Sequence, residues 1–256
     1  MHAEDDPRGQ HRFDQEYWER HWAPDAETGE DARQPVPASP YLEAEIGHLR
    51  PSTALDAGCG TGTEALWLAH RGWQVTGADI SATALTAAAA RAEAEGLTGR
   101  VSWTEADLTQ WEPGRMWDLV VTHYAHPDSG QLAFYERIAS WVAPGGTLLI
   151  VGHLHAPHAG HHAHGEHGVD SGHGDHGEHG VESGHGDHGE LREHDGNAGQ
   201  TGSGHPEGST ATLAGITGLF SVPGWTVERG YESTRTMEAG ERSITLQDVV
   251  VRATRT

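Results

Sequence analysis

A glycine-rich turn between an apolar run and a periodic segment constrains the fold of this chain more than any other feature. The run ends at Asp56, the turn carries Gly58, Gly60 and Gly62, and the periodic segment follows at Glu64–His70. This order predicts a strand, a tight turn and a helix. Glycine lets the backbone adopt positive φ and approach a ligand closely, and the free N–H groups at a helix start suit an anion. The segment therefore predicts a ligand-binding loop, with an ordinary strand-to-helix turn as the alternative.

The spacing of these glycines separates two kinds of nucleotide-binding turn. A dinucleotide fingerprint has its third glycine three positions after the second, and Thr63 occupies that position here. A nicotinamide-dependent oxidoreductase is disfavoured for this reason. The stretch Asp56-Ala57-Gly58-Cys59-Gly60-Thr61-Gly62 instead resembles motif I of the class I S-adenosylmethionine-dependent methyltransferases. The resemblance implies that S-adenosyl-L-methionine contacts this stretch at every residue except Ala57.

Strand and helix patterns alternate five times along residues 53–151, which predicts a parallel, doubly wound α/β sheet. Ligands of such sheets bind beyond the carboxyl ends of the strands, near the point where the strand order reverses. The glycine turn, Asp79, Asp107 and His123 each follow an expected strand end. We therefore expect these residues to line a single crevice.

Two acidic residues at these strand ends have distinct expected roles. Asp79 lies close to the spacing at which an acid accepts hydrogen bonds from ribose hydroxyls, and Ile80 follows it as a further expected cofactor contact. The alternative for Asp79 is a cap on the next helix, which Ser81 can equally provide. By resemblance, Asp107 with the apolar Leu108 matches the pair that contacts the adenine. A solvated loop acid is the alternative for Asp107.

The fourth strand, expected over residues 117–124, is a near-continuous apolar run of the kind buried between helices. By resemblance, the segment after it is motif IV, which faces the methyl group and the substrate. His123 is expected to contact the cofactor, and His123, Tyr124 and His126 are the candidate catalytic or substrate-contacting residues, since imidazole titrates near neutrality. A general base is needed only where the nucleophile arrives protonated, so the catalytic residue stays open. Simple packing of His123 against the cofactor is the alternative.

An aromatic segment near the start of the chain predicts a helix. Phe13 and Tyr17 are four residues apart, as are Trp18 and Trp22, which places large rings on one helical stripe. One interpretation is packing on the edge of the domain. The other is a lid whose Trp18 and Trp22 cover the cofactor, because thiopurine- and tellurite-type methyltransferases begin with a similar element.

The end of the chain predicts a helix at 210–220 and strands at Trp225–Ser233 and Ser243–Arg252. Class I methyltransferase sheets finish in an antiparallel hairpin, so the resemblance implies a seven-stranded, mostly parallel Rossmann-like sheet. We expect three parts: an N-terminal tail and lid helix (1–40), a methyltransferase domain (41–154 and 209–256) and an insertion (155–208). The insertion is rich in His, Gly, Asp and Glu and has too little apolar surface to offset the entropy of ordering.

Histidines in this insertion follow a repeated His-x-x-His pattern. Neutral imidazole suits nickel, zinc and copper, so loose, non-catalytic metal binding is one hypothesis and a solvated linker is the other. A metal-binding or metal-responsive protein on a cofactor-binding scaffold is thus the alternative function. The expected ligands are His161, His162, His164, His167, His173, His176, His179, His185 and His188.

Composition limits the partners. The formal net charge of −22, with His counted as neutral, opposes a nucleic-acid partner because phosphate binding needs clustered Lys and Arg. The single cysteine excludes an intramolecular disulfide. No apolar run is long enough to span a bilayer and no signal peptide is apparent, so we expect a cytoplasmic protein without a membrane partner.

The methyl acceptor is expected to be a small molecule or an inorganic nucleophile. No Asn-Pro-Pro-Tyr-like segment, which marks amino-methylating enzymes of DNA and RNA, follows the fourth strand. Thiols and the oxyanions of sulfur, selenium or tellurium are hypotheses by analogy. The sequence makes no prediction of oligomeric state.

Overall fold

The computed structural model describes residues 13–23, 37–154, 211–239 and 242–256, and nothing is described of the side chains at 237–244. The expected insertion at 155–208, with the nine histidines predicted as metal ligands, lies outside the described residues. The helices are α1 (Gln15–Trp22), α2 (Tyr41–Ile46), α3 (Thr63–His70), α4 (Ala82–Ala94), α5 (Gln131–Ala139) and α6 (Leu213–Leu219). The strands are β1 (Thr53–Ala57), β2 (Gln74–Asp79), β3 (Val101–Glu105), β4 (Trp117–His123), β5 (Val142–His153), β6 (Trp225–Ala239) and β7 (Arg242–Arg255).

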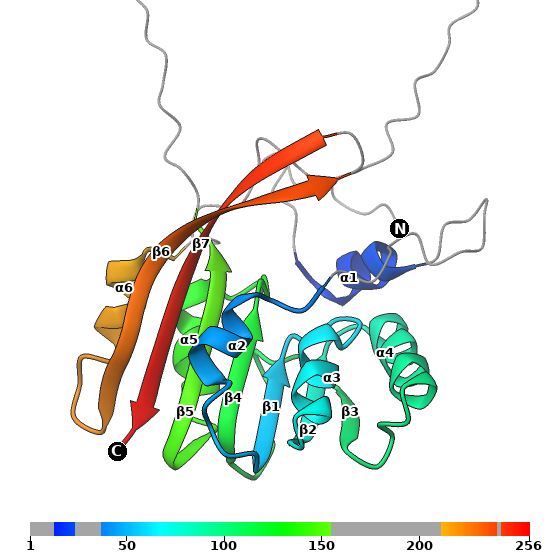
Figure 1. Ribbon diagram of the computed structural model, residues 1–256, viewed down its shortest axis with the longest axis horizontal. Coiled ribbons are helices and arrows are strands. Elements are labelled where there is room, and N and C mark those ends of the chain that lie inside the picture. The colour runs from blue at the N-terminus through cyan, green and yellow to red at the C-terminus, as the bar shows by residue number, and fades with distance from the viewer. Residues whose placement is uncertain (1–12, 24–36, 155–210, 240–241) are drawn as a thin grey trace, which may run out of the picture. The chain divides into compact units, whose positions relative to one another are not determined.

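All seven strands form one mixed sheet in the order β3-β2-β1-β4-β5-β7-β6 (Figure 1). The first five are parallel, and β7 is antiparallel to both β5 and β6. The prediction of a mostly parallel, doubly wound sheet with an antiparallel C-terminal hairpin is confirmed. The strand order reverses between β1 and β4, so the ends of these two strands mark the topological switch point.

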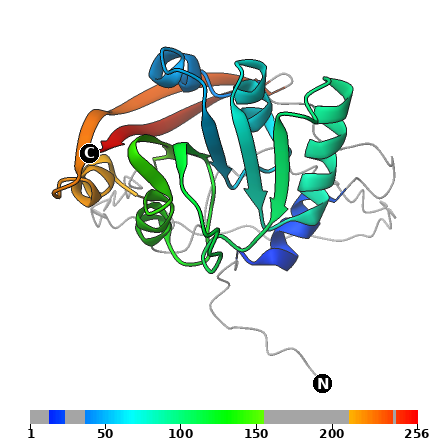
Figure 2. The ribbon, with the colours of Figure 1, turned by 90° about the horizontal axis from the view of Figure 1, so that it is seen from below.

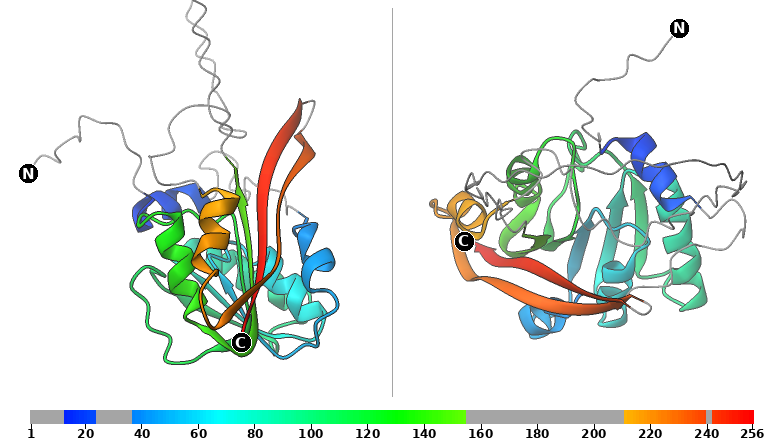
Figure 3. Two further views of the ribbon diagram at one scale, coloured as in Figure 1. Left: turned by 90° about the vertical axis from the view of Figure 1, so that its left-hand side faces the viewer. Right: turned by 90° about the horizontal axis from the view of Figure 1, so that it is seen from above.

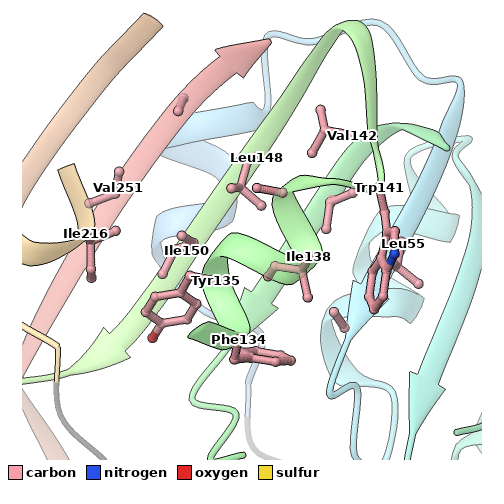
Figure 4. Close-up of a cluster of buried hydrophobic side chains, with 14 of the residues drawn as sticks. Leu55, Phe134, Tyr135, Ile138, Trp141, Val142, Leu148, Ile150, Ile216 and Val251 are labelled. Carbon is pink, nitrogen blue, oxygen red and sulfur yellow. The ribbon is translucent and has the colours of Figure 1, made fainter. Parts of the chain in front are cut away.

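Helices cover both faces of the sheet, as Figure 3 shows. One core lies under α5 and α6, and the other lies under α2 and α3. Figure 4 shows Phe134, Tyr135 and Ile138 of α5 beside Leu148 and Ile150 of β5. Because β4 and β5 are buried on both faces, their sequences are near-continuous apolar runs rather than alternating ones.

Two helix starts follow the local signals in the sequence. Ser81 accepts a hydrogen bond from the Ala84 N–H and caps α4, and Gly96 follows the helix with φ +69°. Thr212 caps α6 in the same way through the N–H of Gly215. These side chains satisfy N–H groups that lack an intrahelical partner.

The sequence offers Asp128 or Ser129 as the cap of the helix after β4, and it predicts a buried face made by Leu132, Tyr135, Ala139 and Val142. Neither Asp128 nor Ser129 is the cap, because the helix begins after Gly130, which provides no side-chain cap. Leu132 is 39% exposed, and the buried stripe passes through Gln131 instead. Tyr135, Ala139 and Val142 are buried as expected, but Val142 belongs to β5, which begins before the turn at Pro144-Gly145-Gly146 rather than after it.

The hairpin strands are longer than the sequence indicated and extend past the rest of the sheet. β7 pairs with β5 only from Asp248 to Thr254, whereas β6 and β7 pair with each other up to Ala239 and Arg242. The two strands therefore continue as an arm beyond the carboxyl end of β5, at the upper edge in Figure 1.

Replacing Gly77 with alanine is expected to lower the free energy of unfolding by about 1–3 kcal/mol, because overpacking a filled core costs about that much. A Cβ at Gly77 would lie 2.4 Å from Cζ3 of Trp103. Gly99→Ala is the matched control, since a Cβ there meets no described atom within 4 Å. Urea-induced unfolding measures both variants, and equal stability would contradict this close packing.

Candidate functional site

The carboxyl ends of four neighbouring strands, β4, β1, β2 and β3, meet at one edge of the sheet. Asp56 is level with Val121 on one side and with Gly77 on the other. Backbone hydrogen bonds extend this alignment past the strands: the Gly58 N–H donates to the Ala78 carbonyl, and the Ala106 N–H donates to the backbone carbonyl of Asp79, both at 2.8 Å. The structure therefore places the glycine turn and the residues after β2, β3 and β4 along one edge.

The glycine turn has the backbone geometry that its sequence predicts. Gly58, Gly60 and Gly62 have φ of +79°, +49° and +79°. A Cβ at Gly58 would lie 2.7 Å from Cβ of Ala125, in the loop after β4. The turn therefore needs glycine both for its conformation and for its closeness to the motif IV segment.

Arg91 of α4, which the sequence reasoning missed, holds the turn from the outside. Its guanidinium donates to the Thr61 carbonyl at 2.8 Å and to Thr63 Oγ1 at 3.0 Å. Cys59 is buried beneath the turn, and burial raises the pKa of its thiol well above the usual value. An arginine late in an Ala-rich helix carries no sequence signal for this contact.

Asp79 ties the glycine turn to the start of α4. Its Oδ2 accepts the Gly60 N–H at 2.8 Å, and its Oδ1 accepts the Ser81 N–H at 3.0 Å. Burial raises the pKa of the Asp79 carboxyl, while these backbone N–H groups oppose the shift. Ser81 provides the side-chain cap of α4, so capping does not account for Asp79. A carboxylate has about four acceptor positions, which leaves capacity for hydroxyl donors.

Two buried polar groups beside the turn lack hydrogen-bond partners among the described residues. They are Oδ2 of Asp56, a side chain that is 1% exposed, and both ring nitrogens of His123, which is 9% exposed. Burial raises the pKa of Asp56 well above its usual value, and the nearby charge of Glu64 adds to this. Burial lowers the pKa of His123. Unpaired buried polar groups are rare in proteins, so this cluster is suited to a ligand that brings donors.

Asp107 and Leu108 have local roles that the sequence did not indicate. The Asp107 carboxylate accepts hydrogen bonds from Thr109 N–H and Oγ1 and from Gln110 Nε2, at 2.7–2.9 Å. Burial opposes its ionisation, but these bonds keep the pKa of Asp107 below the usual value. Leu108 is 7% exposed and packs in the core beneath α5. Ile80, the other apolar candidate, is half-buried at the end of β2.

Helix α1 lies beside the carboxyl ends of β2 and β3 (Figures 1 and 2). Glu19 accepts the Ala82 N–H at 2.6 Å, and Gln15 donates to Glu105 at 3.1 Å. A Cβ at Gly60 would lie 3.1 Å from the ring of Trp22, so this ring covers the glycine turn.

The other aromatic rings of this region continue toward the segment after β4. Trp18 packs in a cluster with Phe13, Tyr17 and His21. Phe13 in turn stacks on His126, with 5.6 Å between the ring centroids. The aromatic residues therefore join α1 to the motif IV segment.

A second polar cluster, missed from the sequence, surrounds Asp248 of β7. This fully buried carboxylate accepts hydrogen bonds from Tyr41, Tyr124 and Arg235 at 2.6–3.1 Å. Its Oδ1 lies 3.3 Å from Nδ1 of His153. Burial opposes ionisation of Asp248, but the donors lower its pKa to about 2. The only sequence signal was an acid placed directly before three valines.

Comparison with known proteins agrees with this geometry. Residues 54–146 match a family model described as a methyltransferase domain. This match spans β1 to the start of β5, and the strand order and the glycine turn agree with it. The chain carries a class I S-adenosylmethionine-dependent methyltransferase domain.

Relatives of this methyltransferase domain are named for different substrates. The chain is 35% identical over 125 residues to ribosomal RNA small subunit methyltransferase C of Alcanivorax borkumensis, covering 46% of this chain and 38% of that protein. It is 30% identical over 137 residues to probable thiol methyltransferase 2 of Arabidopsis thaliana, covering 52% and 60%. The chain thus spans less than two thirds of either relative.

Solved structures share the fold of this methyltransferase domain. TehB from Haemophilus influenzae has a TM-score of 0.55 at 13% identity, covering 84% of this chain and 66% of that chain. Magnesium protoporphyrin IX methyltransferase (ChlM) from Synechocystis with bound SAH has a TM-score of 0.51 at 18% identity, covering 84% and 78%. Within the described ranges, no helix is both long and apolar enough to cross a membrane.

Two aspartate-to-asparagine substitutions are expected to change stability in opposite directions. Because the folded pKa of Asp56 is raised, ionised Asp56 costs stability at pH 7, and Asp56→Asn should raise the free energy of unfolding by about 1 kcal/mol or more. The gain should vanish as the pH falls below about 4, the ordinary pKa of an aspartate, because the carboxyl then becomes protonated in both states. Urea-induced unfolding at several pH values measures it.

Asp118→Asn is the matched control at the opposite end of β4. Hydrogen bonds from Ser52 and Thr53 lower the pKa of Asp118, so its ionised form stabilises the fold above about pH 4 and this contribution is lost at lower pH. The substitution should cost less than about 1 kcal/mol at pH 7, because the group is exposed. If Asp56→Asn also lowers the free energy of unfolding at pH 7, as Asp118→Asn does, ionised Asp56 does not destabilise the folded protein and the assignment is wrong.

Proposed function

We propose that this protein transfers a methyl group from S-adenosyl-L-methionine to a small-molecule or inorganic nucleophile. The observation that carries the proposal is the convergence of the glycine turn, the Asp79 carboxylate, the unpaired Oδ2 of Asp56 and the unpaired ring of His123 at the switch point of the sheet. All of these groups lie at the edge where doubly wound sheets bind ligands.

The residues at this edge fit the chemical groups of the cofactor. Asp79 has acceptor capacity for the ribose hydroxyls, and Asp56 has an unpaired buried oxygen for the ammonium group of the methionine portion. The turn from Gly58 to Gly62 allows close backbone approach, and Trp22 covers it. When bound, the cofactor supplies an electrophilic methyl group on a sulfonium leaving group. The protein then contributes mainly proximity and orientation.

The preference for a small acceptor rests on charge and on the cover over the site. The net charge of −22 opposes a polynucleotide, although one relative is a ribosomal RNA methyltransferase by name. The probable thiol methyltransferase among the relatives is compatible with a small nucleophile. Helix α1 lies over the glycine turn, beside the strand ends at which an acceptor would enter.

Metal binding by the His-rich tract stays a separate prediction. The nine candidate histidines lie outside the described residues, and within the described ranges no group of three or more His, Cys, Asp or Glu side chains is arranged to hold a metal ion. The alternative of a metal-responsive protein therefore has no support from the described residues.

Isothermal titration calorimetry with S-adenosyl-L-methionine tests the cofactor site. We expect micromolar binding to the wild-type protein and at least tenfold weaker binding to Gly58→Ala and Asp79→Asn. The first variant places a Cβ 2.7 Å from Ala125, and the second removes the charge that orders the turn. Asp118→Asn, far from this edge, should bind as tightly as the wild type. Absence of binding to the wild type, or equal binding by all variants, would reject the assignment.

An acceptor panel scored by release of S-adenosylhomocysteine tests the substrate class. We expect turnover with a small thiol such as 2-mercaptoethanol or with an oxyanion such as selenite or tellurite. We expect none with a ribosomal RNA fragment, because the negative charge of the protein repels it. Turnover of the RNA alone would overturn the small-acceptor proposal while leaving the cofactor assignment intact.

A further inference from the structure

His153 and Asp248 form a histidine–carboxylate pair whose chemistry is set by burial. Nδ1 of His153 lies 3.3 Å from Oδ1 of Asp248, which is 0% exposed. Because the pKa of Asp248 is about 2, this carboxylate is ionised at neutral pH and only accepts hydrogen bonds. Nδ1 must therefore be the donor, and in the neutral imidazole Nε2 is then the basic nitrogen.

The ring of His153 is held in place while Nε2 stays available. It stacks on Tyr124, with the centroids 4.3 Å apart and an angle of 26° between the planes. The side chain is 35% exposed, and Nε2 has no hydrogen-bond partner among the residues that the structure describes. The ring of His126 lies on the same side, at 6.3 Å. Asp248 thus fixes the tautomer, and Tyr124 fixes the plane of the ring.

Tyr124 itself is in an uncommon conformation. Its φ of +54° is the only positive value outside glycine in the described ranges. Its backbone N–H donates to Val151, and its hydroxyl contacts both Asp248 and Arg235. Such conformations cost free energy and persist where surrounding contacts impose them, often at functional sites.

The pair lies at the same edge as the candidate cofactor site. His123, at the end of β4, is level with Val151, so His153 projects two residues beyond that point on the neighbouring strand. Asp248 pairs with His153 across β5 and β7, at the base of the hairpin arm. The titratable groups in direct contact with His153 are Asp248 of β7 and the rings of Tyr124 and His126 after β4. Arg235 of β6 and Tyr41 of α2 are linked to it through Asp248.

We propose that His153 is the general base that deprotonates the acceptor and that Asp248 is its positioning residue. This role rests on the proposed methyl transfer. The acceptor class is then a hydroxyl or thiol that arrives protonated. Nε2 takes the proton, the freed lone pair forms the new bond to the methyl carbon, and the electrons of the broken carbon–sulfur bond stay on the sulfur. The proton leaves Nε2 for water after transfer.

The other two histidines at this edge are less suited to this role. His123 is enclosed, with both nitrogens buried. The ring of His126 is engaged on two sides, because its Nδ1 lies within 3.4 Å of the Gln131 amide and its face stacks on Phe13. His153 combines an orienting carboxylate with an accessible nitrogen, which is the arrangement that general bases share.

The kcat of His153→Gln with two different thiols distinguishes a general base from a structural residue. With 2-mercaptoethanol, which is protonated at neutral pH, kcat should fall about 10²–10⁴-fold, the usual contribution of general base catalysis. With 4-nitrothiophenol, which is already ionised, kcat should change less than threefold. Binding of S-adenosyl-L-methionine by calorimetry should be unchanged, and the acid limb of the pH–rate profile with 2-mercaptoethanol should disappear.

His70→Gln is the matched control, because His70 pairs with Glu95 at 2.7 Å on the exposed end of α3. It should keep the wild-type kcat with both thiols. If His153→Gln also keeps the wild-type kcat, or if its kcat falls by the same factor with both thiols, the base assignment is wrong. Failure of the wild type to bind S-adenosyl-L-methionine would instead reject the proposed function.

Nitrogen-15 NMR of the imidazole rings tests the pair without turnover. His153, assigned by the loss of its signal in His153→Gln, should be the Nδ1–H tautomer, and Asp248→Asn should shift it toward Nε2–H. Circular dichroism confirms that each variant is folded. An Nε2–H tautomer in the wild-type protein would overturn the proposal whether or not either thiol is a substrate.

Discussion

The hydrogen bonds of the Asp79 carboxylate are the interaction on which the candidate site depends. One side chain joins three elements, because it accepts from the glycine turn at Gly60 and from the start of α4 at Ser81 while ending β2. Burying a carboxylate is costly unless donors compensate it, and backbone N–H groups supply that compensation here. The turn can offer these donors only because its glycines adopt positive φ.

The same edge also holds polar atoms that lack partners among the described residues, Oδ2 of Asp56 and both ring nitrogens of His123. Asp56 and His123 are buried against the turn, and Glu64 adds a further negative charge beside Asp56. A ligand-free protein bears the desolvation cost of these groups, whereas a bound ligand with a cationic donor would offset it. Affinity for such a ligand and the desolvation cost in the free protein therefore have a common physical origin.

The Asp248 cluster depends on the antiparallel hairpin in the way that the glycine turn depends on the parallel strands. Tyr41, Tyr124, His153 and Arg235 come from four separate parts of the chain and meet on one fully buried carboxylate. Arg235 neutralises this charge, so the ion pair joins β6 to β7 at the base of the arm. Removing one partner of such a pair leaves a buried charge, which typically costs about 3–5 kcal/mol. The cluster is thus both a structural joint and the orienting group for His153.

Local sequence patterns determined the order of the strands and helices, the glycine turn, the cap at Ser81 and the grouping of functional residues at strand ends. These features depend on hydrogen bonds and side-chain periodicity among near neighbours, so the residues themselves carry the signal. Tertiary structure alone decided the rest. It turned Leu132 outward and brought His153 to Asp248 across 95 positions of the chain. Such contacts follow from how distant strands align, and because strand register is set by packing across the whole sheet, no short stretch of sequence specifies it.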